Sequence, residues 1–324
     1  NTTYTLPIDD GTASQFLQTD GAGVLSWSTP VGSGDVSAAA NFGTDNVLIR
    51  ADGTTKGVQS TGIVVDDSNN ITGVPSLNGG QLSGFRNHVI NGAMMVAQRG
   101  TSFISTSTPA NNDDTYLLDR WVLLSDGNDI VDVTQATDVP TGGLYSIGLD
   151  VETVNKKFGI LQVIEQKNCI GLIGQTVNLS AYLRVTNTTR LDKIKMAIIA
   201  WDGTADAVTS DIVSAWGVDG TNPTLVANWT YENTPADLGV TTSWARYSVT
   251  AAIDTASAKN IGVFIWSDNV TDTDLADFLY ITDVQLELGD AATAFERRPF
   301  QHEQHLCQRY FNKVSRDATK LMLG

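Results

Sequence analysis

The chain has 324 residues, of which 41% are hydrophobic, so it is long and apolar enough to bury a sizeable core. Its 20 basic and 36 acidic side chains give a formal net charge of −16. This charge argues against a nucleic-acid or anionic-membrane partner, because both require concentrated Lys and Arg. Two cysteines, Cys169 and Cys307, are too few for a disulfide framework.

Residues 1–84 are rich in glycine and poor in large side chains. They hold 13 of the 29 glycines, a single tryptophan, Trp27, and no glutamate. Short apolar pieces such as Val47-Leu48-Ile49 alternate with turn signals such as Asp52-Gly53. Pieces this short cannot bury a core alone, which predicts β-segments that stack or wind around symmetry mates. The alternative is a flexible linker.

Two stretches of this part resemble the β-rich shaft segments of bacteriophage tail fibres: YTLPIDDGTASQFLQTDGAGVLSW (4–27) and NFGTDNVLIRADGTTKGVQSTGIVVDDSNNITGVPSLNG (41–79). The resemblance implies an intertwined homotrimer. It also implies that other phage tail proteins join the chain on its N-terminal side.

From residue 85 the chain becomes denser in apolar and charged side chains. Its segments resemble, in order and spacing, the jelly-roll domain of phage tail-fibre proteins, which is similar to carbohydrate-binding modules. The segments that carry this resemblance are NHVINGAMMVAQRG (87–100), YLLDRW (116–121), IEQKNCIGLIGQTVNLSAYLRV (164–185), TTSWARYSVT (241–250), YITDVQLELGDAATAFERRP (280–299) and HEQHLCQRYF (302–311). The resemblance implies a glycan-binding β-sandwich.

Strand patterns independently favour a two-sheet sandwich, because many short strands and turn signals precede residue 300 without a long helical period. Residues 280–288 alternate apolar and polar side chains, which predicts a closing edge strand that lies beside residues 87–100. Residues 261–266 are apolar on both faces and must be covered on both. The second cover is either a neighbouring protomer or a loop of the same chain.

After Pro299, an apolar stripe of Leu306, Tyr310 and Val314 predicts a terminal helix. His302, His305 and Cys307 lie close together there. In a symmetric trimer they could bind a transition metal, but exposed polar side chains on a short helix are the simpler interpretation.

Catalysis is poorly supported, and we expect no enzymatic activity. The three histidines, His88, His302 and His305, sit at the edges of the predicted domain, and no G-x-S-x-G or Cys/His pattern accompanies them. Most acidic residues lie in turn contexts such as Asp126-Gly127-Asn128-Asp129, where turn chemistry explains them. A glycan depolymerase with two carboxylates across a cleft stays an alternative.

A calcium ion is the one cofactor that the resemblance suggests, because jelly-roll binding modules often hold Ca²⁺ with oxygen ligands from the first and last strands. Asn91 and Asp283 occupy the matching places. The alternative is that both side chains hydrogen-bond to neighbouring backbone.

Aromatic side chains are the expected glycan contacts, because a flat ring stacks on the C–H face of a sugar. Trp121 and Trp244 lie in strand-like segments and are predicted to be core. The candidates for ligand contact bracket a polar, glycine-rich stretch typical of recognition loops: Trp201, Trp216, Trp229 and Tyr231. The competing interpretation is that these rings are packed.

Together these observations predict an all-β protein with a trimeric β shaft (1–84), a jelly-roll sandwich (85–299) and a C-terminal helical segment (300–324). The resemblance implies a virion tail-fibre protein that adheres to a bacterial surface glycan or other envelope receptor without catalysis. A structural fibre segment with receptor binding elsewhere, a depolymerase, and a secreted carbohydrate-binding module are the alternatives.

Overall fold

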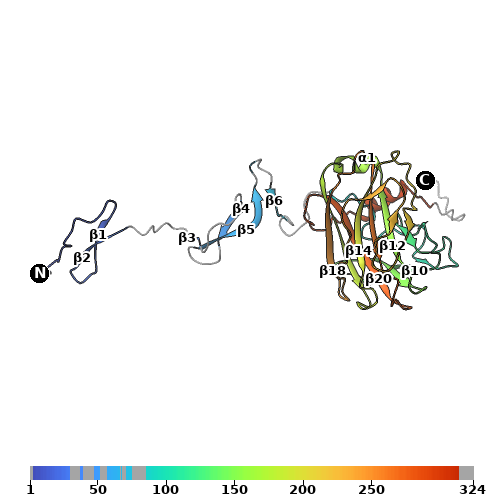
Figure 1. The fold of residues 1–324 in the computed structure, drawn as a ribbon, viewed down its shortest axis with the longest axis horizontal. Coiled ribbons are helices and arrows are strands. Elements are labelled where there is room, and N and C mark those ends of the chain that lie inside the picture. The colour runs from blue at the N-terminus through green and yellow to red at the C-terminus, as the bar shows by residue number, and fades with distance from the viewer. Residues whose placement is uncertain are drawn as a thin grey trace, which may run out of the picture. The chain divides into compact units, whose positions relative to one another are not determined.

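The computed structural model describes residues 3–29, 37–38, 47–51, 57–65, 67, 71–74 and 85–313. They belong to two compact units, residues 1–74 and 75–324, which we describe separately (Figure 1). The boundary predicted near residue 84 falls among residues outside this description. Within the described residues, no helix has the length and apolar character that crossing a membrane requires.

The first unit contains a hairpin of β1 (Phe16–Thr19) and β2 (Leu25–Ser28). Its turn is closed by Asp20, whose Oδ1 accepts hydrogen bonds from the backbone N–H groups of Ala22 at 2.8 Å and Val24 at 3.1 Å. The ring of Trp27 lies over Gly11, where a Cβ would approach the ring to 2.7 Å, and its Nε1 donates to the Asp9 carbonyl at 2.9 Å.

A second sheet of this unit comprises β3 (Ser37–Ala38), β4 (Val47–Ala51), β5 (Gly57–Val65) and β6 (Ile71–Thr72). The predicted β-segments are therefore confirmed. No described residue of the unit belongs to a buried hydrophobic cluster. Large apolar side chains are instead exposed: Tyr4, Leu6, Ile8, Phe16, Leu17, Val24, Leu48, Ile49 and Ile71.

The second unit is a sandwich of two six-stranded antiparallel sheets, as predicted (Figure 1). The first sheet has the order β18 (Ala245–Ala252), β13 (Thr176–Val185), β20 (Phe278–Leu288), β11 (Ser146–Val151), β10 (Val131–Ala136), β7 (Ser102–Phe103). The second sheet has the order β17 (Trp229–Tyr231), β14 (Ile194–Trp201), β19 (Asn260–Ser267), β12 (Phe158–Ile164), β9 (Val122–Ser125), β8 (Thr115–Tyr116).

The core lies between the sheets and takes alternate side chains from each. Leu279 and Ile281 of the first sheet and Val263 and Ile265 of the second are fully buried there. Trp121 is also fully buried, as predicted, and its Nε1 donates to the Asn91 carbonyl at 3.0 Å.

The strand β20 lies in the middle of the first sheet, between β13 and β11, so the prediction of a closing edge is wrong. Its polar side chains Gln285 and Glu287 are buried rather than solvated. They lie under the exit segment, residues 289–299, where Glu287 accepts from Thr293 N–H at 2.8 Å and Gln285 from Glu296 N–H at 2.8 Å. Alternation of apolar and polar residues does not by itself show whether the polar face of a strand meets water or a polar segment of the chain.

A bulge in β20 joins this strand to the start of the domain. Asp283 and Val284 together oppose a single residue of β13, and Asp283 has a positive φ of 49°. The Val284 N–H thereby donates to the Gly92 carbonyl at 3.0 Å, and a Cβ at Gly92 would come within 2.1 Å of the Val284 carbonyl oxygen. Residues 87–100 therefore lie beside β20, as predicted.

The exit segment also clamps the point where the chain enters the domain. The Glu296 carboxylate accepts the backbone N–H groups of Phe85 at 2.8 Å, Arg86 at 2.5 Å and Asn87 at 2.8 Å. Arg298 adds a hydrogen bond to the Asn87 carbonyl. Burial raises the pKa of Glu296, but the three N–H donors and the positive charge of Arg298 outweigh it, so this pKa lies below its ordinary value.

The outer face of the second sheet is covered by a loop of the same chain, residues 202–228, which we call the covering loop. Phe264 and Trp266 of β19 stack at 4.5 Å on this face and are fully buried. Trp216 and Leu225 of the covering loop pack against their cluster. The second face of residues 261–266 is therefore covered by a loop of the same chain, which is one of the two alternatives that the sequence left open.

Two buried lysines and one buried aspartate fasten the covering loop. The Lys157 Nζ lies 2.6 Å from Asp268 Oδ1 and 2.6–2.8 Å from the carbonyls of Trp216, Val218 and Thr221. The Lys195 Nζ lies 2.7 Å from Asp268 Oδ2 and 2.8 Å from the Gly220 carbonyl. The Lys157 and Asp268 side chains are completely buried.

The C-terminal helix α2 (Phe300–Gln308) is short, as predicted. Its Cys307 is buried in a small cluster with Ile90 and Val96, against which Leu306 and Tyr310 pack. The third residue of the predicted stripe, Val314, lies outside the described residues. A single helical turn, α1 (Gln166–Cys169), continues into the 3-10 turn Ile170–Leu172.

Replacing Lys157 by Met is expected to lower the free energy of unfolding by about 3–5 kcal/mol, because it leaves a buried carboxylate and three loop carbonyls without this ammonium. Urea denaturation of the two proteins measures the difference. The matched control is Lys156→Met, whose ion pair with Asp126 is half-exposed and worth about 0–1 kcal/mol. Equal effects of the two substitutions would show that Lys157 does not fasten the loop.

Candidate functional site

The four aromatic residues predicted to contact glycan lie together, but within the packing of the covering loop. Trp229 is 6% exposed, and its ring centroid lies 5.5 Å from that of Trp201. The Trp216 ring lies 6.2 Å from Phe264, and the Tyr231 hydroxyl donates to the Pro223 carbonyl at 2.9 Å. Trp229 is thus packed, whereas Trp201, Trp216 and Tyr231 are half-buried, and ligand contact at these three rings stays a prediction.

The two residues predicted to bind calcium have other partners. The Asn91 amide donates to the Val96 and Asp119 carbonyls at 2.9 Å and accepts the Val96 N–H at 2.9 Å. Asp283 forms a 2.7 Å ion pair with Arg297, which leaves one unpaired oxygen, Oδ1. Backbone hydrogen bonding explains Asn91, and a single free carboxylate oxygen is too few ligands for calcium.

The described part of the single chain contains no group of three or more His, Cys, Asp or Glu suited to a metal, and a site shared between protomers at His302 and His305 stays a prediction. Cys307 is buried, and this burial raises the pKa of its thiol.

A different set of side chains meets on the outer face of the first sheet. Alternation along β20 places Phe278 and Tyr280 on this face, opposite the core residues Leu279 and Ile281. Strand pairing then sets Gly148 of β11 and Arg184 of β13 directly beside Tyr280. Trp244 lies at the start of the next strand, beyond Arg184.

Three aromatic rings form a row across this face, which we call the aromatic row. The Phe278 and Tyr280 rings are nearly parallel, at 4°, with centroids 5.2 Å apart. The Trp244 ring lies 6.3 Å from that of Tyr280 at an angle of 51°. All three side chains are half-buried, so part of each ring is available to a ligand.

Gly148 is necessary for the position of the Tyr280 ring. A Cβ at residue 148 would lie 3.0 Å from Tyr280 Cε1 and 3.3 Å from Cδ1. Because real Cβ atoms seldom approach so closely, any larger residue would displace the ring. The missing side chain lets Tyr280 lie across the neighbouring strand.

Asp138 orients the polar groups of the row. Its Oδ1 accepts the Trp244 Nε1–H at 2.8 Å, and its Oδ2 forms an ion pair with Arg184. The Arg184 guanidinium lies 5.6 Å from the Tyr280 ring centroid and donates through Nε to the Thr242 carbonyl at 2.8 Å. The row is therefore held in place before any ligand arrives.

Asp150 supplies an acidic group next to the row, opposite Phe278 in the sheet. Its Oδ1 is buried without a hydrogen-bond partner. Burial, with the nearby Glu152 and Asp132, raises the pKa of Asp150 to about 6. Such a group changes charge close to neutral pH.

The sequence analysis missed this face. It assigned Trp244 to the core, and this is wrong, since Trp244 is half-buried on the outer face. The available signal was the alternation of Phe278 and Tyr280 with Leu279 and Ile281, because aromatic residues on the polar side of a strand indicate a surface platform.

Comparisons with known proteins add a structural likeness only. Neither a protein-family model nor a characterised protein sequence matches the chain. Tailspike protein 4 of bacteriophage CBA120, in its enzymatically active domain, is similar with a TM-score of 0.37 and 18% identity, over 65% of this chain and 22% of that one.

Two carbohydrate-binding modules are also similar to the chain. A family 16 module has a TM-score of 0.29 and 16% identity over 48% of this chain and 84% of its own. A family 22 xylan-binding domain from Paenibacillus barcinonensis has a TM-score of 0.32 and 14% identity over 56% of this chain and 94% of its own. All these TM-scores are below 0.5, so they do not indicate what this chain binds.

Replacing Asp150 by Asn is expected to change how stability depends on pH. Because the folded pKa of about 6 exceeds the ordinary value of 3.8, the folded state holds the proton more tightly, and stability falls as pH rises from about 4 to about 6. Asp150→Asn removes this contribution to the pH dependence of stability. Urea denaturation of variant and wild type between pH 4 and 7 measures the difference in their free energy of unfolding at each pH. A constant difference across this range would contradict the raised pKa.

Proposed function

We propose that the second unit binds a glycan along the aromatic row without acting on it. The observation that carries the proposal is the row itself, with three rings aligned across an exposed sheet face and polar groups fixed beside them. Apolar C–H faces of sugars stack on such rings. Arg184 and Asp150 offer a charged donor and a charged acceptor for the hydroxyl groups.

Hydrolysis is the second candidate, because the row also has a pair of carboxylates. Asp132 and Asp150 lie directly opposite each other on neighbouring strands, and both have a raised pKa caused mainly by burial. A glycosidase, however, needs its two carboxylates on opposite sides of the scissile bond. These two lie side by side on one sheet face, which favours binding over cleavage.

The first unit supports a role in assembly. Its described strands expose apolar side chains and have no core of their own, which is unusual for a unit that is stable alone. Identical copies would cover these side chains, and we infer a homotrimer. Three binding faces on one particle multiply weak sugar contacts into strong attachment. A phage tail fibre that attaches a virion to the bacterial surface, with other tail proteins on the N-terminal side, fits this arrangement.

Substitution in the aromatic row is expected to weaken glycan binding. On a printed array of bacterial surface polysaccharides, Tyr280→Ala and Trp244→Ala should each reduce affinity about tenfold or more, since each ring contributes about 1–2 kcal/mol of stacking and burial. The matched control is Trp201→Ala, because Trp201 ends β14 and packs against the cluster that the covering loop closes. Loss of binding by Trp201→Ala with retention by Trp244→Ala would place the site on the second sheet, beside the covering loop, instead.

The molar mass of the native protein tests the assembly. Light scattering on the full chain is expected to give three copies, because the exposed apolar strands of the first unit require partners. Removal of residues 1–74 should reduce the number of copies if these strands carry the contacts. A monomeric full chain would exclude a trimeric fibre and leave a glycan-binding module.

A further inference from the structure

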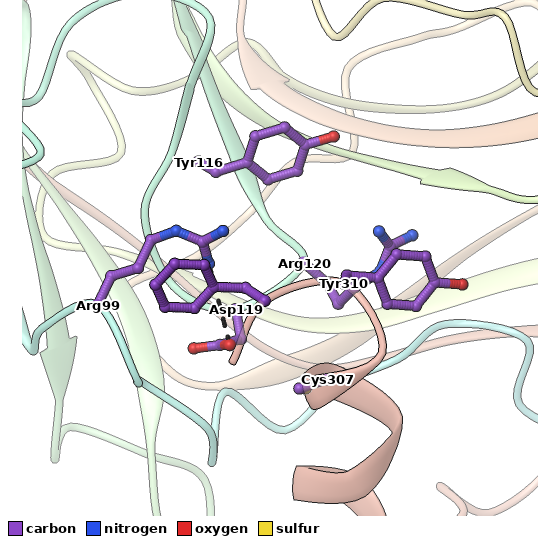
Figure 2. Close-up of a pocket in the computed structure, with 7 residues that line it drawn as sticks. Arg99, Tyr116, Asp119, Arg120, Cys307 and Tyr310 are labelled. Atoms are coloured by element: carbon purple, nitrogen blue, oxygen red, sulfur yellow. Dashed lines mark ion pairs between the residues drawn. The ribbon is translucent and has the colours of Figure 1, made fainter. Parts of the chain in front are cut away.

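A cavity of about 290 Å³ lies between the C-terminal segment and the second sheet (Figure 2). Three segments that carry the resemblance to tail fibres meet here: the end of 87–100, residues 116–121 and residues 307–311. The side chains that bear on its chemistry are Arg99, Tyr116, Asp119, Arg120, Tyr310 and Phe311. The cavity is separate from the aromatic row, which lies on the first sheet.

Arg99 is held in this cavity by the faces of aromatic rings. Its guanidinium carbon lies 3.7 Å from the Phe311 ring centroid and 5.7 Å from that of Tyr116 (Figure 2). The side chain is 16% exposed. Within the described residues its guanidinium makes no hydrogen bond, and the carboxylate oxygen in its ion pair, Asp119 Oδ1, is 3.9 Å from Nη1.

The Asp119 carboxylate has other partners. Both of its oxygens accept hydrogen bonds from Gln98, one from the backbone N–H and one from the side-chain amide, each at 2.6 Å. Gln98 Nε2 also donates to the Phe311 carbonyl at 2.8 Å, which fastens the C-terminal segment. The hydrogen bonds of Asp119 therefore go to Gln98, and its ion pair with Arg99 stays beyond hydrogen-bond distance.

A second guanidinium increases the positive charge. The Arg120 carbon lies 3.6 Å from the Tyr310 ring centroid, and its Nη2 donates to the Val163 carbonyl at 2.5 Å, but its buried Nε has no acceptor. The cavity thus has two cationic side chains and one carboxylate, in a chain of net charge −16. This local excess of positive charge favours a ligand oxyanion in the cavity.

We propose that this cavity binds the carboxylate or phosphate group of a small ligand, with the N–H edge of Arg99 as its donor. A planar guanidinium presents two parallel N–H groups that match both kinds of oxyanion. The rings on its faces prevent it from turning away. The uronate units and the phosphate groups of envelope polymers share this chemistry, and the cavity has room for one such group rather than a polymer chain.

Isothermal titration calorimetry of the full-length protein tests this proposal with three probes: glucuronate, inorganic phosphate and neutral glucose. We expect glucuronate, phosphate or both to bind in the millimolar range or tighter, and any heat from glucose to be unchanged by Arg99→Gln. Arg99→Gln should weaken anion binding at least tenfold. Binding of glucuronate alone identifies a carboxylate ligand, and binding of phosphate alone identifies a phosphorylated one.

The matched control is Arg309→Gln, because Arg309 lies on the C-terminal segment that borders the cavity but is half-exposed and pairs with Glu165. This variant should bind the anions as the wild type does. A second variant, Arg99→Lys, controls for misfolding. It keeps the positive charge but lacks the two parallel N–H groups of the guanidinium, so it should retain the thermal unfolding midpoint and bind the anions with intermediate affinity. Absence of anion heat in the wild type, or equal affinity in Arg99→Gln, would overturn the proposal and leave Arg99 a purely structural role.

Discussion

The buried carboxylate of Asp268 is the constraint on which the sandwich depends. The second sheet is apolar on both faces, so its outer face needs a cover, and the cover is an irregular loop with many backbone carbonyls. Such carbonyls cannot be buried without donors. Lys157 and Lys195 supply the donors, and the carboxylate of Asp268 forms an ion pair with each of them. The ammonium of Lys157 is surrounded by oxygen atoms and stabilises the loop, as a bound metal cation stabilises loops in other proteins.

The covering loop closes the outer face of the second sheet, whereas the outer face of the first sheet is closed only in part. The outer face of the first sheet has a polar part, closed by the exit segment through Gln285 and Glu287, and an open part with the aromatic row. The same strand, β20, supplies both parts. Asp138 and Gly148 then orient the row, one through hydrogen bonds and the other through the absence of a side chain.

Much of the fold could be predicted from local patterns. Alternation in residues 280–288 and the double apolar face of residues 261–266 correctly indicated a sandwich and a covered second sheet. The position of β20 at the sheet centre could not be predicted, because its polar residues find partners in the exit segment, which only the fold brings to them. The choice between a protomer and a loop as the cover likewise depends on the distant pair Lys157 and Asp268.

The site was harder to predict because the same residue types serve packing and recognition. Trp216 and Trp229 lie in a polar stretch of the sequence, yet both pack in one cluster with Phe264 and Trp266 on the outer face of the second sheet. Trp244 directly precedes β18 in a strand-like segment, yet its hydrogen bond to Asp138 and its neighbour Arg184 hold it on the outer face. Which ring is free is decided by contacts between segments far apart in the chain.

The clamp at Glu296 has a mechanical consequence. Three successive N–H groups of residues 85–87 are bound to one carboxylate, and the Glu296 N–H is bound to Gln285 in the middle strand of the first sheet. A pull on the chain at residue 85 is therefore passed to the centre of the sheet, where strands on both sides share the shear. Load that enters at the centre is shared by the hydrogen bonds on both sides of β20 and does not peel the sheet from its edge, one hydrogen bond after another.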